Sequence, residues 1–298
     1  MSGPEAPTTP RTIAAARRWG MATLRAAGIT SAGIDVRRLL AAALALPEAQ
    51  ILARPEAELP PGRARIFASY IERRCGREPV ARILGVREFY GRSFAVSAAT
   101  LDPRPDSETL IEATLEIVGF EDWATRPLRI LDVGTGTGCL LLTLLSELAQ
   151  ATGLGTDLSA AALEVARDNA AALGLAQRVA WQTTDLLENI EGEFHIVVSN
   201  PPYVSSAEIA TLAPEVSRFD PRLALDGGTD GLEIFRRLST GLFEVVPNGW
   251  IVLEVGHDQA DRVVEVLAAG APVGAAPRVN FYRDVSGRRR CVAVRTRN

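Results

Sequence analysis

The stretch that decides the fold is LRILDVGTGTGCLLLTLL, residues 128–145. An apolar run of strand length, 128–133, leads into three alternating glycines, and a Leu-rich segment of helical character follows. Strand, glycine loop and helix in this order are typical of nucleotide-binding α/β domains. The glycines let the backbone pass close to a ligand, and the helix N-terminus offers free N–H groups. We therefore predict an α/β domain whose ligand site begins at this loop.

The spacing of the loop narrows the class of ligand. It reads G-x-G-x-G, whereas dinucleotide-binding domains carry G-x-G-x-x-G, and Asp132 lies at its entrance. A carboxylate there is unfavourable for a pyrophosphate but suits a ligand with a cationic or amino-acid end, such as S-adenosylmethionine. A dinucleotide-dependent oxidoreductase is a weak alternative, and a glycine turn that binds nothing is another.

A second expected strand, around 153–156, ends in Asp157, 23 residues after Gly134. In nucleotide-binding folds a carboxylate at this place accepts the ribose hydroxyls. The competing role of helix cap is filled by Ser159, which precedes a helical segment at 160–173. We therefore predict that Asp157 binds a ribose.

A third expected strand, 178–182, leads to Asp185 and Leu186. We predict that these two residues hold an adenine, Asp185 by a polar contact and Leu186 as an apolar wall.

Asn200, Pro201, Pro202 and Tyr203 follow a fourth apolar run, 194–199. Open α/β sheets bind ligands at the carboxyl ends of their strands, so this corner is expected on the same rim as the glycine loop. Proline has a fixed φ and no N–H, which makes the corner stiff and rich in hydrogen-bond acceptors. Such a frame suits a substrate that carries an NH2 group, and Tyr203 adds a flat face for a planar amide or base.

The remaining segments are less informative. Residues 12–77 are Ala- and Leu-rich, and this pattern predicts three to five short helices. We expect these helices to form a lid or a docking surface for a macromolecule, and residues 73–77 to be a solvated helix end. Residues 80–85 and 87–96 predict a strand, a turn and a strand. Asp106 or Ser107 is expected to cap a helix at Glu108. Helices are expected at 232–246 and 259–269, and a fifth strand is expected at 250–255. The last two expected strands, 279–284 and 290–295, would form an antiparallel pair. Residues 205–230 are long and irregular, and we expect a flap over the substrate.

Composition excludes several kinds of site. All 32 basic residues are Arg, so no lysine can form a Schiff base or act as a general base. Three Cys and two His show no metal-ligand spacing, so no metal is predicted, and the thiols favour a reducing cytoplasm. No apolar span of membrane length appears. The net charge of -4 disfavours direct sequence-specific nucleic-acid binding.

These parts together predict methyl transfer from a sulfonium to an NH2 nitrogen. A carboxamide nitrogen is a poor nucleophile, and the Asn200 side-chain oxygen with the Pro201 carbonyl would accept both of its N–H bonds. This grip would stabilise the positive charge that grows on nitrogen, and it needs no ionisable base.

The run Asp132–Gly138, Asp157 and the corner resemble class I S-adenosylmethionine-dependent methyltransferases of the amino-group type. Four further stretches resemble the PrmC/HemK family of peptide-chain release factor N5-glutamine methyltransferases: 77–80 with 83–85, 88–91, 103–108 and 220–228. The resemblance implies a Rossmann-like domain with a mostly parallel seven-stranded sheet, preceded by a small all-helical domain and a β-hairpin linker. The expected division is 1–78, 79–106 and 107–298.

The resemblance also implies a substrate and a product. The substrate is the glutamine in the Gly-Gly-Gln loop of class-1 release factors, and the product of the donor is S-adenosylhomocysteine. Apart from the resemblance, we expect the protein to be a cytoplasmic monomer. The expected catalytic residues are Asn200, Pro201, Pro202 and Tyr203. The expected donor-binding residues are Asp132, Gly134, Thr135, Gly136, Thr137, Gly138, Asp157, Asp185, Leu186 and Asn200. Many family members carry an aromatic residue in place of Leu186.

Two alternatives use the same motifs. An N6-adenine methyltransferase of DNA or RNA grips an exocyclic amine with the same kind of corner, although the charge and the motifs outside the core disfavour it. A non-enzymatic, donor-binding scaffold associated with translation would retain the fold, although an intact Asn200 and Tyr203 argue against a decayed site.

Overall fold

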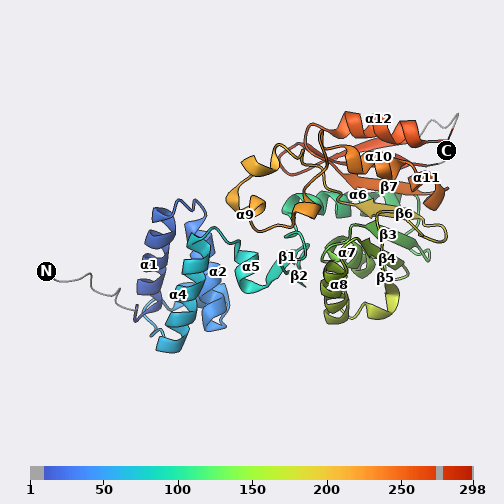
Figure 1. Ribbon diagram of the computed structural model, residues 1–298. Helices are drawn as coiled ribbons and strands as arrows, with labels where there is room; N and C mark the ends of the chain where they lie inside the picture. Colours follow the sequence, from blue (N-terminus) through green and yellow to red (C-terminus); the bar gives the residue numbers. More distant parts are fainter. Residues whose placement is uncertain (1–9, 273–277, 297–298) are drawn as a thin grey trace. The chain divides into compact units, whose positions relative to one another are not determined.

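The computed structural model describes residues 10–272 and 278–296. The chain divides into two compact units that meet in sequence between Gly85 and Val86. Each unit has its own hydrophobic core, and the candidate site lies in the second (Figure 1). The predicted division at 78, 106 and 298 stays a prediction, and the hairpin that was expected to link two domains lies within the second unit.

The first unit is helical in its described part, as the Ala- and Leu-rich pattern predicted. Its helices are α1 (Ile13–Ala26), α2 (Ala32–Leu44), α3 (Glu48–Ala53), α4 (Pro61–Cys75) and α5 (Val80–Leu84). Thr12 caps α1 by accepting a hydrogen bond from the amide of Ala15 at 3.2 Å. The core joins Leu24, Leu39 and Phe67 from three helices. Apolar residues at helical spacing therefore account for this bundle.

The prediction of a strand at 80–85 is wrong, because these residues form α5. Pro79 precedes the helix, and Gly85 ends it in the left-handed conformation at φ 70°. Ile83 is buried in the core of the first unit. Arg73 donates to the carbonyls of Ile83 and Arg82, at 3.2 and 3.4 Å, and so satisfies the end of this short helix. Contacts with α4 thus outweigh the β propensity of the sequence.

The prediction of a solvated helix end at 73–77 is wrong for Arg74. Its guanidinium is buried and donates to Asp35 at 2.8 Å. A buried cation needs such a partner, since removing a charge from water is costly. This pair therefore links α4 to α2 inside the bundle.

The second unit opens with a hairpin of β1 (Val86–Phe89) and β2 (Arg92–Ala95), which is shorter than predicted. Next come the 3-10 turn η1 (Pro105–Ser107) and helix α6 (Glu108–Phe120). Asp106 lies within η1, and the predicted cap by Ser107 was not found, because the side chain of Ser107 makes no capping hydrogen bond to α6. Its hydroxyl serves the candidate site instead.

A seven-stranded sheet forms the centre of the second unit. Its strands are β3 (Arg129–Val133), β4 (Thr152–Asp157), β5 (Val179–Thr183), β6 (Ile196–Ser199), β7 (Trp250–Glu254), β8 (Arg278–Arg283) and β9 (Arg289–Arg295). The order in space is β5-β4-β3-β6-β7-β9-β8, and β9 runs opposite to the other six strands, so its pairings with β7 and β8 are antiparallel and the rest are parallel. The predicted Rossmann-like, mostly parallel sheet is confirmed. The order reverses between β3 and β6, and such a reversal opens a crevice at the strand ends.

Helices cover both faces of this sheet (Figure 1). On one face, Ile130 and Val198 pack with α6, α7 (Cys139–Glu147) and α8 (Ala160–Ala172). On the other, Leu131 and Val197 pack with α10 (Glu233–Ser239), α11 (Leu242–Val245) and α12 (Ala260–Gly270). The predicted single helix at 232–246 breaks between α10 and α11. The short elements are η2 (Ala176–Arg178), η3 (Ile209–Thr211), α9 (Pro214–Ser217) and η4 (Arg222–Ala224).

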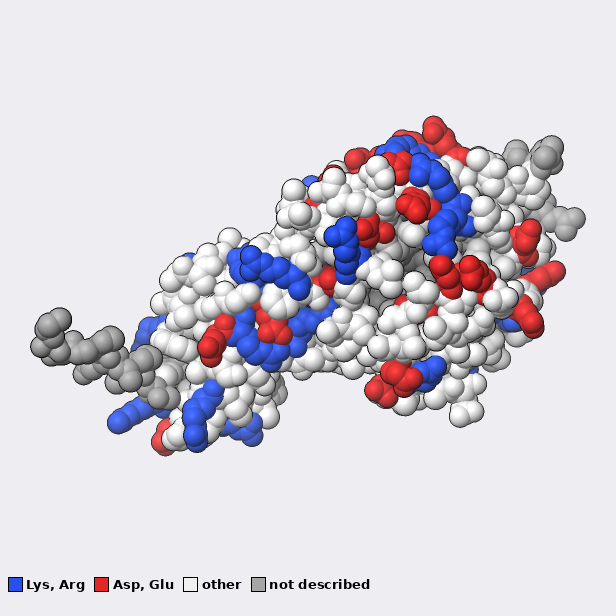
Figure 2. Space-filling model, in the orientation of Figure 1, with Lys and Arg blue, Asp and Glu red and all other residues white. Residues whose placement is uncertain are grey.

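The two units differ in charge. Residues 1–85 contain 13 Arg and 7 acidic residues, a net charge of +6, whereas residues 86–298 contain 19 Arg and 29 acidic residues, a net charge of -10. On the face shown in Figure 2, basic side chains outweigh acidic ones over the first unit, and both kinds mix over the second. The overall charge of -4 therefore hides a basic unit. Within the described residues, no helix combines the length and the apolar character needed to cross a bilayer.

Candidate functional site

A cavity lies at the carboxyl ends of β3, β4 and β6, on both sides of the point where the strand order reverses. Its wall includes the glycine loop, part of the 3-10 turn η1, two residues of the Asn-Pro-Pro-Tyr corner, Asn200 and Pro202, and part of the 205–230 segment. Among the predicted site residues, those that line it are Gly134, Thr135, Gly136, Thr137, Asp157, Asp185, Leu186, Asn200 and Pro202. Asp132, Gly138, Pro201 and Tyr203 lie outside the lining.

The glycine loop adopts a backbone that other residues rarely take. Gly134, Gly136 and Gly138 have φ values of 72°, 55° and 79°. A Cβ on Gly138 would also approach Leu142 to 3.0 Å and Trp181 to 3.2 Å. The loop is therefore glycine-rich for two reasons, its left-handed turns and the close approach of α7.

Asp157 fixes the loop to the end of β4. Its Oδ2 accepts a hydrogen bond from the amide of Gly136 at 2.9 Å, and its Oδ1 accepts one from the amide of Ser159 at 2.8 Å. Burial raises the pKa of this carboxyl, although these amide bonds oppose the rise. Ser159 caps α8 as predicted, accepting from the amide of Ala162 at 3.2 Å. Each carboxylate oxygen still has a lone pair that can accept from a ribose hydroxyl.

Asp132 lies beneath the loop, fully buried. Thr135 donates to its Oδ2 at 2.6 Å, whereas Oδ1 accepts no hydrogen bond from the described residues. Burial raises the pKa of this carboxyl to about 7, against the lowering effect of Thr135. A buried oxygen without a donor is costly, and an ammonium group of a ligand would relieve that cost. The loop and this acid therefore fit the amino-acid end of S-adenosylmethionine.

Asn169 on α8 supports the loop from behind. Its Nδ2 donates to the carbonyl of Thr137 at 2.9 Å and to that of Ala95 at 3.1 Å, and its Oδ1 accepts from the amide of Ala95 at 2.7 Å. The sequence analysis missed this residue, because a lone Asn inside a helical segment carries no motif. The bonds tie the loop to the hairpin strand β2.

Asp185 and Leu186, which the sequence predicts to hold an adenine, both line the cavity. Arg237 on α10 makes an ion pair with Asp185 at 2.8 Å and also lines the cavity. Leu186 adopts a left-handed backbone, φ 54°, which is costly for a leucine. The pair fixes the direction of the Asp185 carboxylate, and nothing in the sequence connected Arg237 to this position.

The side chains of the corner join a buried polar group. Asn200 donates through Nδ2 to the Ser107 hydroxyl at 3.2 Å, and Tyr203 donates to Oε1 of Glu254 at 3.3 Å. Burial raises the pKa of Tyr203, and the charge of Glu254 adds to the rise. Burial also raises the pKa of Glu254 to about 7, which a hydrogen bond from Ser107 and the charge of Arg290 counteract. The sequence analysis missed Glu254, and it expected Ser107 only as a helix cap.

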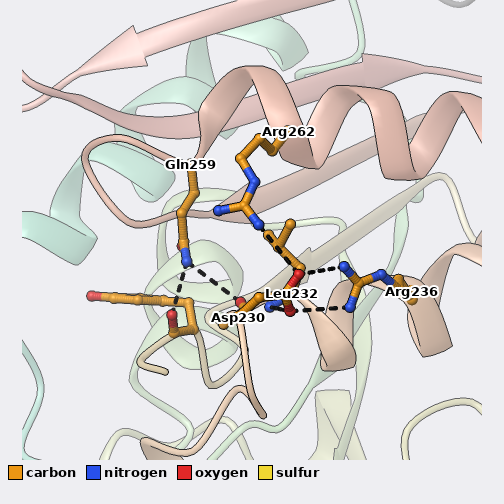
Figure 3. A network of polar contacts seen from close by, with 7 residues as sticks. Asp230, Leu232, Arg236, Gln259 and Arg262 are labelled. Carbon is orange, nitrogen blue, oxygen red and sulfur yellow. Dashed lines mark hydrogen bonds and ion pairs between the residues drawn. The ribbon is translucent and has the colours of Figure 1, made fainter. Parts of the chain in front are cut away.

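The backbone of the Asn-Pro-Pro-Tyr corner is held by Gln259 and packs against nearby glycines. Gln259, just before α12, donates through Nε2 to the carbonyl of Tyr203 at 2.9 Å and to that of Gly231 at 3.5 Å (Figure 3). A Cβ on Gly227 would lie 2.8 Å from the carbonyl oxygen of Pro202, and one on Gly231 would lie 2.4 Å from that of Tyr203. The glycines that follow Asp226 therefore let this segment lie directly against the corner.

The 205–230 segment is ordered by hydrogen bonds at both of its ends. The amide of Val204 donates to the carbonyl of Leu225 at 3.0 Å, and the amide of Gly227 donates back to that of Val204 at 2.8 Å. Arg104, which lies between Pro103 and Pro105, makes an ion pair with Asp220. Leu223 and Ala224 line the cavity. The segment thus contributes part of the wall, and its role as a flap stays a prediction.

Comparisons with known proteins agree with this architecture. Residues 15–85 match the model of the PrmC N-terminal domain, and residues 118–216 match that of the methyltransferase small domain. The catalytic domain of human METTL16 has a similar fold, with a TM-score of 0.58 and 18% identity over 74% of this chain and 82% of that one.

Two curated relatives span nearly the whole chain. The release factor glutamine methyltransferase of Bradyrhizobium diazoefficiens is 45% identical over 97% of this chain and 96% of its own length. That of Cereibacter sphaeroides is 43% identical over 94% of this chain and 97% of its own length. Both family models and both relatives lead to one assignment: the chain belongs to the PrmC/HemK family of release factor glutamine methyltransferases.

Proposed function

We propose that this protein transfers a methyl group from S-adenosylmethionine to the side-chain amide nitrogen of the glutamine in the Gly-Gly-Gln loop of class-1 peptide-chain release factors. The observation that supports this most strongly is the shared cavity. The glycine loop and Asn200 line it together, on neighbouring parallel strands. The names of the relatives supply the substrate.

The donor supplies a methyl group on a sulfonium, which is already electrophilic, so the main task of the protein is alignment. Asp157 is proposed to bind the ribose hydroxyls, and Asp132 the amino group. Asp185 and Leu186 are proposed to hold the adenine. Of these residues Asp132 is fully buried, whereas Asp157, Asp185 and Leu186 are partly exposed and line the cavity.

Asn200 and Pro201 are proposed to grip the substrate amide. The Asn200 side-chain oxygen and the Pro201 carbonyl would each accept one N–H of the glutamine. Acceptors fixed in this way stabilise the positive charge that grows on nitrogen during transfer. Tyr203 directs its hydroxyl to Glu254, so we propose that it contributes packing and no proton. The proton leaves to water after transfer.

The test is transfer of labelled methyl groups to purified substrates. The arms are a class-1 release factor, the same factor with its Gly-Gly-Gln glutamine changed to alanine, DNA, and ribosomal RNA. We expect label on the unchanged factor alone, at the glutamine, as located by mass spectrometry. Label on nucleic acid would favour an adenine methyltransferase, and donor binding without any transfer would favour a scaffold.

A further inference from the structure

The backbone of the Asn-Pro-Pro-Tyr corner has few supports of its own. Its prolines have no N–H, and neither proline carbonyl accepts a hydrogen bond from the described residues. The ring of proline fixes φ but leaves the direction of each carbonyl to ψ. The proposed grip on the substrate needs the Pro201 carbonyl to point in one direction, so other groups must fix the two ends of the corner.

The two ends of the corner are held by different side chains. Asn200 directly follows strand β6, and its side chain bonds to the Ser107 hydroxyl at 3.2 Å. At the other end, the carbonyl of Tyr203 accepts a hydrogen bond from Gln259 Nε2 at 2.9 Å. Because the prolines between these ends cannot turn about φ, fixing the Tyr203 carbonyl limits the directions open to the Pro201 carbonyl.

Gln259 is buried, and its side-chain amide can take only one orientation. Its Oε1 accepts a hydrogen bond from the amide of Gly256 at 3.0 Å, and only the oxygen end of the amide can face this N–H group. The Nε2 end therefore faces the carbonyls of Tyr203, at 2.9 Å, and of Gly231, at 3.5 Å (Figure 3). Gly256 lies just after β7, the neighbour of β6 in the sheet. Gln259 thus ties the end of the corner to the adjacent strand end.

The chain around Gln259 leaves room for this side chain and for nothing larger. A Cβ on Gly256 would lie 2.5 Å from Oε1 of Gln259, and one on Gly231 would lie 2.6 Å from its Nε2. Both positions therefore require glycine while the amide is in place. Asp230 fixes the segment that carries Gly231, because it makes an ion pair with Arg262 of α12 at 3.2 Å (Figure 3). The surroundings of the amide are thus fixed as well as the amide itself.

A second buried amide makes the same pattern of hydrogen bonds at the glycine loop. Asn169 donates through Nδ2 to the carbonyls of Thr137 and Ala95, at 2.9 and 3.1 Å, and its Oδ1 accepts from the amide of Ala95 at 2.7 Å. Like Gln259, it offers its nitrogen to two carbonyls and its oxygen to one backbone N–H. Neither amide is among the described residues that line the cavity. One side-chain amide therefore supports each half of the cavity from behind.

We propose that Gln259 is a positioning residue for the acceptor half of the cavity. It holds the Tyr203 carbonyl so that the Pro201 carbonyl keeps the direction needed to accept from a substrate amide. The consequence for catalysis rests on the proposed function, whereas the hold on the corner is a property of this chain and can be measured without turnover. A positioning role in one half predicts that turnover and donor binding respond separately to substitution.

The kinetic test removes the hydrogen bonds of Gln259 in two ways. Gln259→Met keeps the length of the side chain without its polar ends, and Gln259→Glu keeps the shape but turns an oxygen toward two carbonyls. Each should lower kcat at saturating donor about tenfold, as expected for one lost hydrogen bond. The KM for the release factor and the dissociation constant of S-adenosylhomocysteine should stay within about twofold of wild type. Gln177→Glu, at an exposed glutamine outside the cavity lining, controls for the added charge and should change none of these values.

Asn169→Leu is the matched variant at the glycine loop. It removes the same pattern of hydrogen bonds, so the dissociation constant of S-adenosylhomocysteine should rise about tenfold. At saturating donor, kcat should stay within about threefold of wild type, because the corner keeps Gln259. Opposite responses of the two sites separate positioning from a general loss of structure, which would lower turnover and donor affinity together in both variants.

The readout that needs no turnover is hydrogen exchange of two amides at the end of the corner, followed by nuclear magnetic resonance. The amide of Val204 donates to the carbonyl of Leu225, and the amide of Gly227 donates to that of Val204. Both should exchange about tenfold faster in Gln259→Met than in the wild type, because the neighbouring Tyr203 carbonyl is released. In Asn169→Leu both should exchange at the wild-type rate.

These measurements separate the positioning role from the proposed function. Faster exchange in Gln259→Met, together with a wild type that methylates no release factor, would disprove the proposed function and keep the hold on the corner. Wild-type exchange and a kcat within twofold of wild type in both Gln259 variants would overturn the positioning role. An equal loss of turnover and donor affinity, or a failure of both variants to fold, would overturn it too, since Gln259 would then be a general support of the fold.

Discussion

The glycine loop and the Asn-Pro-Pro-Tyr corner lie on neighbouring strand ends, yet their supports come from different distances along the chain. Asp157 reaches Gly136 across 21 residues, within one strand-helix-strand unit. Asn200 reaches Ser107 across 93 residues, and Tyr203 reaches Glu254 across 51. The predicted donor side of the cavity, at the glycine loop, is therefore supported mainly within one local unit, with Asn169 adding a tie to Ala95. The predicted acceptor side, at the corner, depends on contacts across the second unit.

The largest effect is expected from a substitution that removes a group from the corner and leaves the glycine loop intact. In Asn200→Ala one of the two acceptors disappears, so kcat should fall on the order of 10²–10³-fold, as when one preorganised polar group is removed from an active site. The affinity for S-adenosylhomocysteine, measured by calorimetry, should change little because the donor side is supported locally. Equal losses of turnover and affinity would show that the two sides are not separable.

The next effect tests how closely the corner depends on its neighbours. Gly231→Ala places a Cβ 2.4 Å from the carbonyl oxygen of Tyr203 and 2.6 Å from Gln259, at a φ of 73°. Clash and left-handed strain together should lower the free energy of unfolding by about 3 kcal/mol and reduce kcat. Gly287→Ala has a similar φ of 79° but meets nothing within 4 Å, so it should cost about 1 kcal/mol and leave kcat normal. Urea unfolding measures both, and equal costs would mean that the clash is relieved by movement.

A smaller effect addresses the donor side. Asp157→Asn keeps the shape but loses the charge and one accepting oxygen, so the dissociation constant of S-adenosylhomocysteine should rise about tenfold. At saturating donor, kcat should stay within about threefold of wild type, since the corner has other supports. Asp168→Asn, on the exposed side of α8, is the control and should change neither value. A large loss of kcat at saturation would contradict the local character of the loop.

The smallest effect concerns the adenine end. Arg237→Ala releases Asp185 from a half-exposed ion pair, and such pairs are weak, so donor affinity should drop about two- to threefold. The difference should shrink at high salt, because salt screens the pair. Arg236→Ala removes the neighbouring Arg of the same helix, which pairs with Asp230 (Figure 3), and should leave donor affinity unchanged. A tenfold loss in Arg237→Ala would indicate direct contact between Arg237 and the donor.

The same contrast explains what could be predicted from the sequence. The glycine loop, the cap at Ser159 and the strand that ends at Asn200 each depend on residues close together in the chain, and all were found where expected. Periodicity and turn chemistry report such local structure. The sheet order then placed the loop and Asn200 on one cavity.

The misses have a common cause in long-range contacts. The sequence indicated only that Glu254 ends a buried strand and that Gln259 begins a helix. Both hydrogen bond to Tyr203, which lies 51 residues from Glu254 and 56 residues from Gln259 in the chain. Residues 80–85 looked like a strand because their β-branched residues favour one, whereas burial of Ile83 against the bundle made them a helix. Single-sequence patterns contain no record of such partners.

The ion pair between Arg290 and Asp106 has a consequence for how the protein is made. It joins β9, near the end of the chain, to the turn before α6. Translation releases the amino-terminal part first, so the loop and its helices emerge well before this arginine does. A nascent chain that has not yet reached β9 therefore lacks the pair between Arg290 and Asp106, although the glycine loop and Asp157 have already left the ribosome.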